Sequence, residues 1–296
     1  MAEFKFLENP ISKKWVILAP RRAKRPDIAH GTEPVCPFCP GREKDEQEVY
    51  RIPASQGEAL QSWLVRVVPN KFPFAPIHEV IIHSPDHHKN FGELPVSQVK
   101  LILQTYRHRF LAHQDKGQVY IFHNRGEAGG ESLPHPHTQL AVVPNEVRMD
   151  IPRLDAVIPV ILNSVQDLTG DGNEMPNQVR HDTVDNMETE HFYLFCPQTS
   201  QWPDEVWVAP KTGGRSFAEI TDEEISGLSH ILGRLVQIFS LRHGNEFPFN
   251  FYIYPGGDWY LRLIPRLKTL GGLEIGTGIF VNTQDPNETI AFIREH

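Results

Sequence analysis

Residues 131–140 read ESLPHPHTQL, and they place His135, His137 and Gln139 at alternate positions. In an extended chain, alternate side chains point to the same face, so these three would line one wall. Proline gives no amide hydrogen to a sheet, and Pro136 therefore predicts either an edge strand or the start of a strand. The alternative is that the histidines merely flank prolines at a surface. We favour a reactive wall, because motifs elsewhere in the chain agree with it.

The composition is that of a globular protein, with 296 residues, 40% of them hydrophobic and 22% charged. This length suffices for one large domain or two ordinary ones. No run of about 18 apolar residues is present, which predicts no membrane span. The first residues, MAEFKFLENP, lack the apolar segment of a secretory signal, and we expect a cytoplasmic protein. The formal net charge of −8 argues against a nucleic-acid binder.

A basic run interrupts this acidic balance. Residues 19–26 read APRRAKRP and contain Arg21, Arg22, Lys24 and Arg25. Such a run is either a solvated turn or a local site for phosphate, whose oxygens match the fork of an arginine side chain. The run by itself does not decide between the two.

The chain contains a degenerate repeat of strands and one long helix. In the first half, strands are expected from His78, from Gly117 and through the PHPHTQLAVVP stretch. Between the first two, Ser97 would cap a helix with the apolar stripe Val99, Ile102, Leu103, Tyr106 and Phe110. In the second half, strands are expected from Asp204, Asn250 and Asp258. Thr221 and Glu224 form a capping box before the stripe Ile225, Leu228, Leu232, Leu235 and Phe239.

These repeated units predict an α+β fold with two histidine-triad-like halves, each an antiparallel sheet with a packed helix. We assign residues 1–168 to the first half, 190–296 to the second, and 169–189 to a linker. Glu79 aligns with Glu205 at an offset of 126, and His137 aligns with Arg262 at an offset of 125. At the second offset His135 aligns with Tyr260 and Gln139 with Ile264, so only the first half keeps its histidines.

Two of the three cysteines, Cys36 and Cys39, form a CPFC knuckle, a spacing that lets two thiolates bind one zinc ion. A closed structural site needs two more ligands. The histidines available are His83, His87, His88, His123 and His135. We favour His87, which follows a turn, and His135, beside the reactive wall, because a zinc ion there would hold the HPH turn rigid. Cys196 stands alone and is expected to be a small buried apolar residue.

Together, four motifs resemble the galactose-1-phosphate uridylyltransferases, the transferase branch of the histidine-triad superfamily. They are WVILAPRRAKRP, CPFCPG, HSPDHHKNFGEL and FHNRGEAGGESLPHPHTQL, the last with Thr138 where the best-known members have glycine. The resemblance covers nearly the whole chain.

The resemblance implies a zinc ion on Cys36, Cys39, His87 and His135. It implies His137 as the nucleophile and Gln139 as its phosphate-binding companion. It also implies contacts to nucleotide, phosphate or sugar from Arg22, Arg25, Asn70, Asn124, Ser132 and Lys268. Finally, it implies a homodimer whose active sites share residues across the interface, acting on nucleotide sugars and sugar 1-phosphates.

The sequence departs from the family's pattern in its second half. The best-known members hold a second metal there with histidines and a glutamate, but here the histidine positions read Tyr254, Arg262 and Ile264. We therefore expect no second metal. The stretch VVPNKFPFA, near the position that binds the base, matches only loosely. Since ADP-glucose phosphorylases share the HPHxQ core, the base is left open between uracil and adenine.

These residues can transfer a nucleotide. A neutral imidazole such as that of His137 can attack the α-phosphorus of a nucleoside diphosphate sugar and form a nucleotidyl-histidine. A second sugar phosphate then attacks this intermediate. The ring must expose its reactive nitrogen, so its other N–H should donate to a backbone carbonyl. Gln139 occupies a position that is usually histidine in the superfamily's hydrolases, and an amide cannot deliver a proton to a leaving group.

Three functions therefore compete. The first is a UDP-glucose–hexose-1-phosphate uridylyltransferase, and the second is an adenylyltransferase or phosphorylase acting on ADP-glucose or a dinucleoside polyphosphate. The third is a non-catalytic, zinc-containing nucleotide-binding protein, which the altered second half makes plausible. Labelling of His137 by UDP-glucose or by ADP-glucose separates them.

Overall fold

The computed structural model describes residues 4–24, 36–54, 63–154 and 186–296. Within these ranges, ten strands form one sheet in which all neighbouring strands are antiparallel. The first half contributes β3 (Tyr50–Ile52), β4 (Val65–Pro69), β5 (Ile77–Ile82), β6 (Gln118–Arg125) and β7 (His137–Val143). The second half contributes β8 (Asn186–Glu188), β9 (Phe192–Phe195), β10 (Val206–Pro210), β11 (Phe249–Ile253) and β12 (Leu261–Pro265). Their order is β3-β4-β5-β7-β6-β11-β12-β10-β9-β8, so β6 and β11 join the halves.

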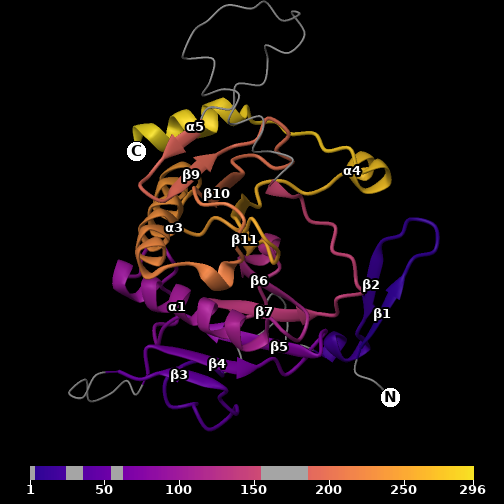
Figure 1. Cartoon of the computed structure of the whole chain (residues 1–296), viewed down its shortest axis with the longest axis vertical. Helices are drawn as coiled ribbons and strands as arrows, with labels where there is room; N and C mark the ends of the chain where they lie inside the picture. Colours follow the sequence, from indigo (N-terminus) through magenta and orange to yellow (C-terminus); the bar gives the residue numbers. More distant parts are fainter. Residues whose placement is uncertain (1–3, 25–35, 55–62, 155–185) are drawn as a thin grey trace, which may run out of the picture.

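Two long helices cover one face of this sheet. They are α1 (Val96–His113) and α3 (Asp222–His243), which pack against each other and against the largest apolar core (Figure 1). Both predicted apolar stripes are buried, from Val99 to Phe110 and from Ile225 to Phe239. The opposite face of the sheet carries the site residues. The fold is thus α+β with two similar halves, as the repeat predicted.

The helix starts differ from one another. The capping box of Thr221 and Glu224 is present, because each side chain accepts a hydrogen bond from the other's backbone N–H. The predicted cap at Ser97 is wrong. Helix α1 begins at Val96 after Pro95, whose carbonyl accepts from the amides of Gln98 and Val99, and no side chain caps it.

Smaller elements lie outside the main sheet. A separate hairpin, β1 (Lys5–Glu8) and β2 (Trp15–Leu18), leads into the short 3-10 helix η1 (Pro20–Lys24). After β12 come α4 (Gly272–Thr277) and α5 (Pro286–Glu295). Within the described part of the chain, two further short 3-10 helices are η3 (Glu127–Gly129) and η5 (Phe217–Glu219). No helix among the described ranges has the length and apolar character needed to cross a bilayer.

Of the stretch predicted as a linker, residues 169–185 lie outside the described part of the chain, and Asn186–Glu188 form β8. Cys196 is buried in the largest core, as expected. Strand β7 begins directly after Pro136, which confirms the strand start. The other alternative, an edge strand, does not apply, since β7 lies between β5 and β6 in the interior of the sheet.

Strand register corrects one part of the repeat. Ile82 pairs with His137 in the first half, and Trp207 pairs with Arg262 in the second, so both strands share an offset of 125. At that offset Glu79 corresponds to Asp204 instead of Glu205. The ion pairs agree with this correspondence. Glu79 bonds Arg109 and His113 at the end of α1, and Asp204 bonds Arg242 and His243 at the end of α3.

Candidate active site

His137 is the first residue of β7, and its side chain is buried with 5% of its surface exposed. Its ring Nδ1 lies 2.9 Å from the backbone oxygen of His135. A carbonyl only accepts, so Nδ1 carries the proton and Nε2 of a neutral ring carries the lone pair. This is the hydrogen bond that the sequence predicted for a reactive imidazole.

The ring of His137 lines a pocket of about 230 Å³. The predicted residues Gln139, Asn70 and Ser132 line the same pocket. The walls are largely apolar and are completed by Pro37, Phe38, Glu46, Val68, Pro69, Lys71, Phe72, Val80 and Leu133. The structure therefore brings four of the predicted residues to one cavity that is lined by rings, aliphatic carbon and a few polar groups, as is usual for small-molecule sites.

Gln139 is held by two residues. Its side-chain oxygen lies 2.9 Å from Nε2 of His78 and 3.4 Å from the side-chain nitrogen of Asn70. Sequence analysis missed His78. The signal was available, because His78, Val80 and Ile82 alternate along β5 on the face that carries the site.

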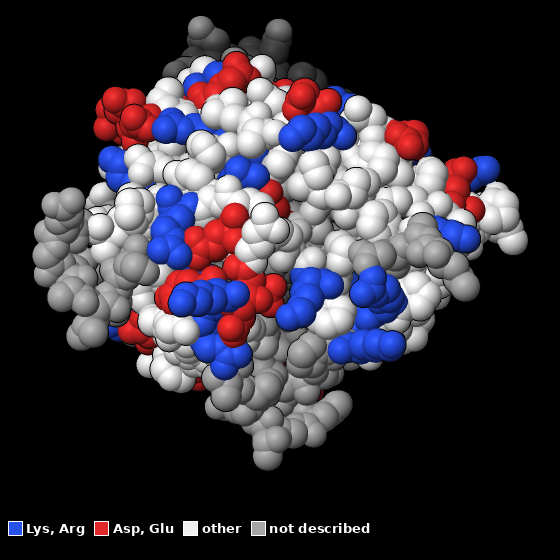
Figure 2. All heavy atoms as spheres, turned by 90° about the horizontal axis from the view of Figure 1, so that it is seen from below, with Lys and Arg blue, Asp and Glu red and all other residues white. Residues whose placement is uncertain are grey.

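The basic run is only partly described, because Arg25 lies outside the described residues. Arg22 donates to the backbone oxygen of Phe72, and its guanidinium lies 4.9 Å from the ring centroid of Phe74. It thus contacts the loop that carries the pocket residues Asn70 and Phe72. Seen from the end of the sheet with β3 and β4, basic side chains are interspersed with acidic ones (Figure 2). Arg22 is thus a cation beside the loop that lines the pocket.

Two predicted residues lie elsewhere. Asn124 is on β6, and its side-chain oxygen accepts a hydrogen bond from Asn250 on β11 at 2.9 Å. Lys268 follows β12, where it donates to the backbone oxygen of Val281 and forms an ion pair with Glu274. Neither residue is among those that line the pocket of His137.

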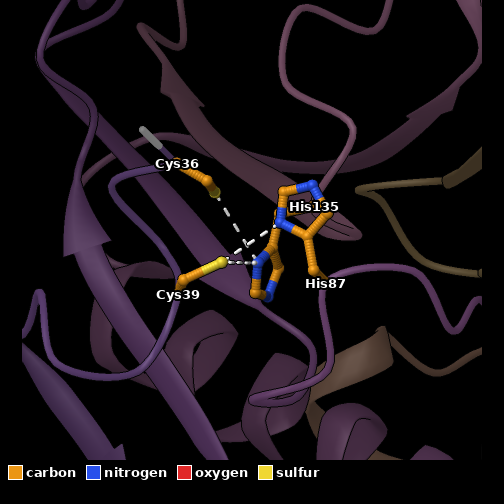
Figure 3. A group of neighbouring side chains, drawn as sticks. All are labelled: Cys36, Cys39, His87 and His135. Carbon is orange, nitrogen blue, oxygen red and sulfur yellow. Dashed lines mark hydrogen bonds between the residues drawn. The ribbon is translucent and has the colours of Figure 1, made fainter. Parts of the chain in front are cut away.

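The four predicted metal ligands converge (Figure 3). Their ligand atoms on Cys36, Cys39, His87 and His135 all lie within 4.8 Å of one another. Nδ1 of His87 is 3.1 Å from Sγ of Cys39, and Nδ1 of His135 is 3.7 Å from each sulfur. Donors around a tetrahedral zinc ion, with bonds of about 2.0–2.3 Å, stand roughly 3.5 Å apart. The spacing fits such an ion.

The chemistry of these donors fits a cation as well. Nε2 of His135 lies 2.8 Å from the backbone oxygen of Ser84, which places the proton there and leaves Nδ1 to bind a metal. Burial lowers the pKa of His135 to about 4, so its ring is neutral near pH 7. Burial and the neighbouring Cys36 raise the pKa of Cys39 to about 11. Cys39 therefore becomes a thiolate near pH 7 only when a positive ion lies beside it.

The sequence model of the family described as galactose-1-phosphate uridyl transferase, N-terminal domain, matches residues 77–142, which include His87, His135, His137 and Gln139. The chain is related to the galactose-1-phosphate uridylyltransferases. One galactose-1-phosphate uridylyltransferase, from Thermotoga maritima, is 25% identical and covers 97% of this chain and 96% of its own length. An ADP-glucose phosphorylase of Arabidopsis thaliana is 26% identical and covers 97% of this chain and 92% of its own length.

Solved structures agree on the fold. The crystal structure of an ADP-glucose phosphorylase from Arabidopsis thaliana with bound ADP-glucose has a TM-score of 0.72 at 24% identity, covering 99% of both chains. A uridylyltransferase structure has a TM-score of 0.71 at 21% identity, covering 98% of this chain and 97% of the other. These likenesses confirm the predicted α+β fold along nearly the whole chain.

Where the best-known galactose-1-phosphate uridylyltransferases have glycine, Thr138 supplies a buried hydroxyl behind β7. Its Oγ1 lies 2.8 Å from Nε2 of His83 and 2.5 Å from the hydroxyl of Tyr106. In the same buried cluster, Nδ1 of His123 lies 2.9 Å from the backbone oxygen of His137. Burial and the neighbouring His137 lower the pKa of His123 to about 3, so its ring is a neutral donor to that carbonyl. This cluster was not predicted from the sequence.

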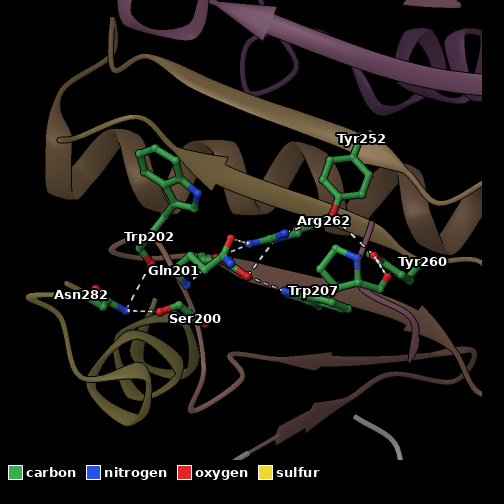
Figure 4. Close-up of polar contacts among 10 residues, drawn as sticks. Ser200, Gln201, Trp202, Trp207, Tyr252, Tyr260, Arg262 and Asn282 are labelled. Atoms are coloured by element: carbon green, nitrogen blue, oxygen red, sulfur yellow. Dashed lines mark hydrogen bonds and ion pairs between the residues drawn. The ribbon is translucent and has the colours of Figure 1, made fainter. Parts of the chain in front are cut away.

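In the second half, a buried ion pair forms at Arg262, one of the positions at which the departure from the family's pattern was noted in the sequence. Arg262 donates to both carboxylate oxygens of Glu205 at 2.8 Å and to the hydroxyl of Tyr252 at 3.1 Å (Figure 4). Trp207 donates to the same carboxylate at 2.7 Å. A guanidinium therefore neutralises Glu205.

Proposed function

We propose that this protein is a nucleotidyltransferase that exchanges sugar 1-phosphates through a nucleotidyl intermediate on His137. The leading reaction is that of a UDP-glucose–hexose-1-phosphate uridylyltransferase. The single observation that carries the proposal is the hydrogen bond from Nδ1 of His137 to the backbone oxygen of His135, in a ring that lines the pocket. It fixes the tautomer whose Nε2 is nucleophilic.

In the first step, Nε2 of His137 forms a bond to the α-phosphorus and the bond to the bridging oxygen breaks. The sugar 1-phosphate leaves as an anion, and the proton stays on Nδ1, which continues to donate to the His135 carbonyl. In the second step, an oxygen of another sugar 1-phosphate attacks the phosphorus and the P–N bond breaks. No net proton transfer is needed, because the leaving and attacking groups are both phosphate anions. The amide of Gln139, which cannot protonate a leaving group, suits this exchange.

Polar groups around the ring would then stabilise charge on the transferred phosphoryl group. We assign Gln139 and Ser132 to its oxygens and Asn70 to the nucleoside, because all three line the pocket. Arg22 would approach from the loop that it contacts. For Arg25 and Asn124 we retain the contacts to nucleotide, phosphate or sugar that the resemblance implied.

We further propose that Zn²⁺ occupies the Cys36–Cys39–His87–His135 cluster, where it would support the turn before β7. Its role there is structural, because four protein ligands close a tetrahedral site. No step of the transfer passes through it.

ADP-glucose phosphorylase is the second candidate, with orthophosphate in place of hexose 1-phosphate as the acceptor. The relative from Arabidopsis thaliana, similar along 97% of this chain, favours it. The two reactions share the nucleotidyl-histidine and differ in the base and in the acceptor.

The decisive experiment is covalent labelling. The purified protein is incubated with UDP-glucose or ADP-glucose, each carrying ³²P in the α-phosphate, then denatured and counted. We expect label in the wild type and in His230→Ala, a surface control, but none in His137→Gly. Label retained by His137→Gly refutes the nucleophile. The nucleotide that labels identifies the base, and release by galactose 1-phosphate or by orthophosphate identifies the acceptor. Stoichiometric binding without label supports a non-catalytic protein instead.

We also propose a homodimer that joins the catalytic half (residues 1–168) of one protomer to the second half (190–296) of its partner. Exposed apolar side chains support it. They lie on the β1–β2 hairpin and around α4, on the same side of the molecule in Figure 1. They are Leu7, Ile11, Val16, Ile17, Leu18, Leu273, Ile275, Ile279 and Val281.

In such a dimer Lys268 would serve the partner's pocket. Mixing His137→Gly with Lys268→Ala chains should then restore transfer activity, because the mixed dimer contains one intact site. Sedimentation equilibrium should give twice the monomer mass. A monomer, or mixed chains that regain no activity, contradicts this arrangement.

A further inference from the structure

We propose that His78 is a positioning residue that orients the side-chain amide of Gln139, so that its NH₂ group, and not its oxygen, faces the transferred phosphoryl group. This inference rests on the proposed function and adds a residue to it. His78 lies on β5 next to β7, and only 4% of its surface is exposed. It is not among the residues that line the pocket, so it would act through Gln139.

The tautomer of His78 follows from its neighbours. The backbone N–H of Phe74 points at Nδ1 of His78, with a nitrogen–nitrogen distance of 3.3 Å. A backbone amide only donates, so Nδ1 accepts and the proton of the neutral ring is on Nε2. That Nε2 lies 2.9 Å from the side-chain oxygen of Gln139. His78 is therefore the donor, and the Gln139 oxygen is the acceptor.

Asn70 fixes the same orientation independently. Its side-chain oxygen accepts from the backbone N–H of Phe72 at 2.9 Å, which turns its NH₂ group the other way. That nitrogen lies 3.4 Å from the oxygen of Gln139 and 3.2 Å from Nε2 of His78. The Gln139 oxygen thus meets two donors. A flipped amide would place its own NH₂ against both of them, so the observed orientation is favoured.

The ring of His78 is itself held in place. It packs on Phe74 with ring centroids 4.1 Å apart. The backbone oxygen of His78 accepts a hydrogen bond from the backbone N–H of Asn70 at 2.7 Å. Arg22 also contacts this loop, at Phe72 and Phe74. The loop therefore fixes Gln139 as a hydrogen-bond donor toward the pocket, which is what a phosphate oxygen requires.

A double-mutant cycle tests the inference. The readout is the single-turnover rate of His137 labelling by the nucleotide sugar that labels the wild type. His78→Phe keeps a ring and removes the donor, and Gln139→Ala removes the amide. We expect each single variant to slow labelling by about 10-fold or more, with substrate affinity within about 3-fold. Because His78 acts through Gln139, the double variant should be no slower than Gln139→Ala.

His78→Gln is the conservative control, since its amide can donate to the same oxygen, and it should recover most of the rate. Metal content and thermal unfolding are measured on every variant. If His78→Phe does not fold, the smaller His78→Leu replaces it in the cycle. The inference is overturned if the rate reductions of the two single variants multiply in the double variant, or if His78→Phe labels at the wild-type rate. Either result leaves the nucleotidyl-histidine intact. A wild type that takes no label overturns the proposed function instead.

Discussion

The ring Nδ1 of His137 lies 2.9 Å from the backbone oxygen of His135, whose own ring belongs to the Cys36–Cys39–His87–His135 cluster. One residue therefore contributes its side chain to the proposed metal site and its carbonyl to the orientation of the proposed nucleophile. Because only Pro136 separates the two histidines in the chain, a change in the cluster should shift the position of the His137 ring.

Removing a ligand from the proposed metal site should lower both stability and labelling. Cys39→Ser removes a ligand, and we expect the metal content to fall well below one ion per chain. The melting temperature should fall by more than about 5 °C, because metal-binding energy is also folding energy. Elemental analysis, calorimetry and His137 labelling measure these effects, with Cys196→Ala as the control that keeps the cluster. Full metal content in Cys39→Ser would contradict the assigned ligands.

Stability should depend on Glu79 at acid pH. Burial opposes its ionisation, but hydrogen bonds from His113 and Arg109 prevail and lower its pKa from the ordinary 4.5. A lowered pKa stabilises the fold above about pH 4.5, and this contribution is lost as the pH falls through the lowered value. Glu79→Gln should lose about 3–5 kcal/mol at pH 7, because Arg109 is left buried without its partner.

Urea unfolding between pH 3 and pH 7 measures this. The variant should show a weaker loss of stability on acidification than the wild type. Glu188→Gln, in an exposed ion pair with Lys211, should stay within about 1 kcal/mol of the wild type. Equal acid sensitivity of Glu79→Gln and the wild type would argue against this role.

The hydroxyl of Thr138 should contribute to stability. Thr138→Val keeps the side-chain shape but removes the buried hydroxyl that both Tyr106 and His83 contact, which leaves them the longer contact of 3.3 Å with each other. We expect a loss of about 1–3 kcal/mol in the free energy of unfolding. Thr105→Val is the matched control, since its hydroxyl bonds only the preceding turn of its own helix. Urea titration of both variants tests the difference, and equal losses would count against a special role for Thr138.

Arg262 should stabilise the fold, because it neutralises the buried carboxylate of Glu205 beside it. Arg262→Met leaves the carboxylate without its counter-ion and should cost about 3–5 kcal/mol. Adding Glu205→Gln removes the unpaired charge, and we expect the double variant to be more stable than Arg262→Met. Its new amide can still accept from Trp207. Chemical unfolding of the three proteins decides this, and a double variant less stable than Arg262→Met would refute the ion-pair account.

Local patterns predicted much of the site. The period of two in residues 135–139 assigned His137 and Gln139 to one face, since strand geometry makes alternate side chains parallel. The CPFC spacing predicted that Cys36 and Cys39 lie together as candidate metal ligands, and both belong to the cluster with His87 and His135. The helical stripes identified which residues of α1 and α3 are buried. These features repeat within a few residues, where the backbone alone determines the relative placement of side chains.

The tertiary structure determined which residues on different strands lie opposite each other. Glu79 corresponds to Asp204 only through strand register, because the sequence offers Glu205 one residue away as an equally acidic match. His78 meets Gln139 only because β5 and β7 are neighbours. Such contacts join residues far apart in the chain, and they are selected by the shared burial of a sheet face and by the need of buried polar groups for partners. No local period of the sequence encodes either requirement.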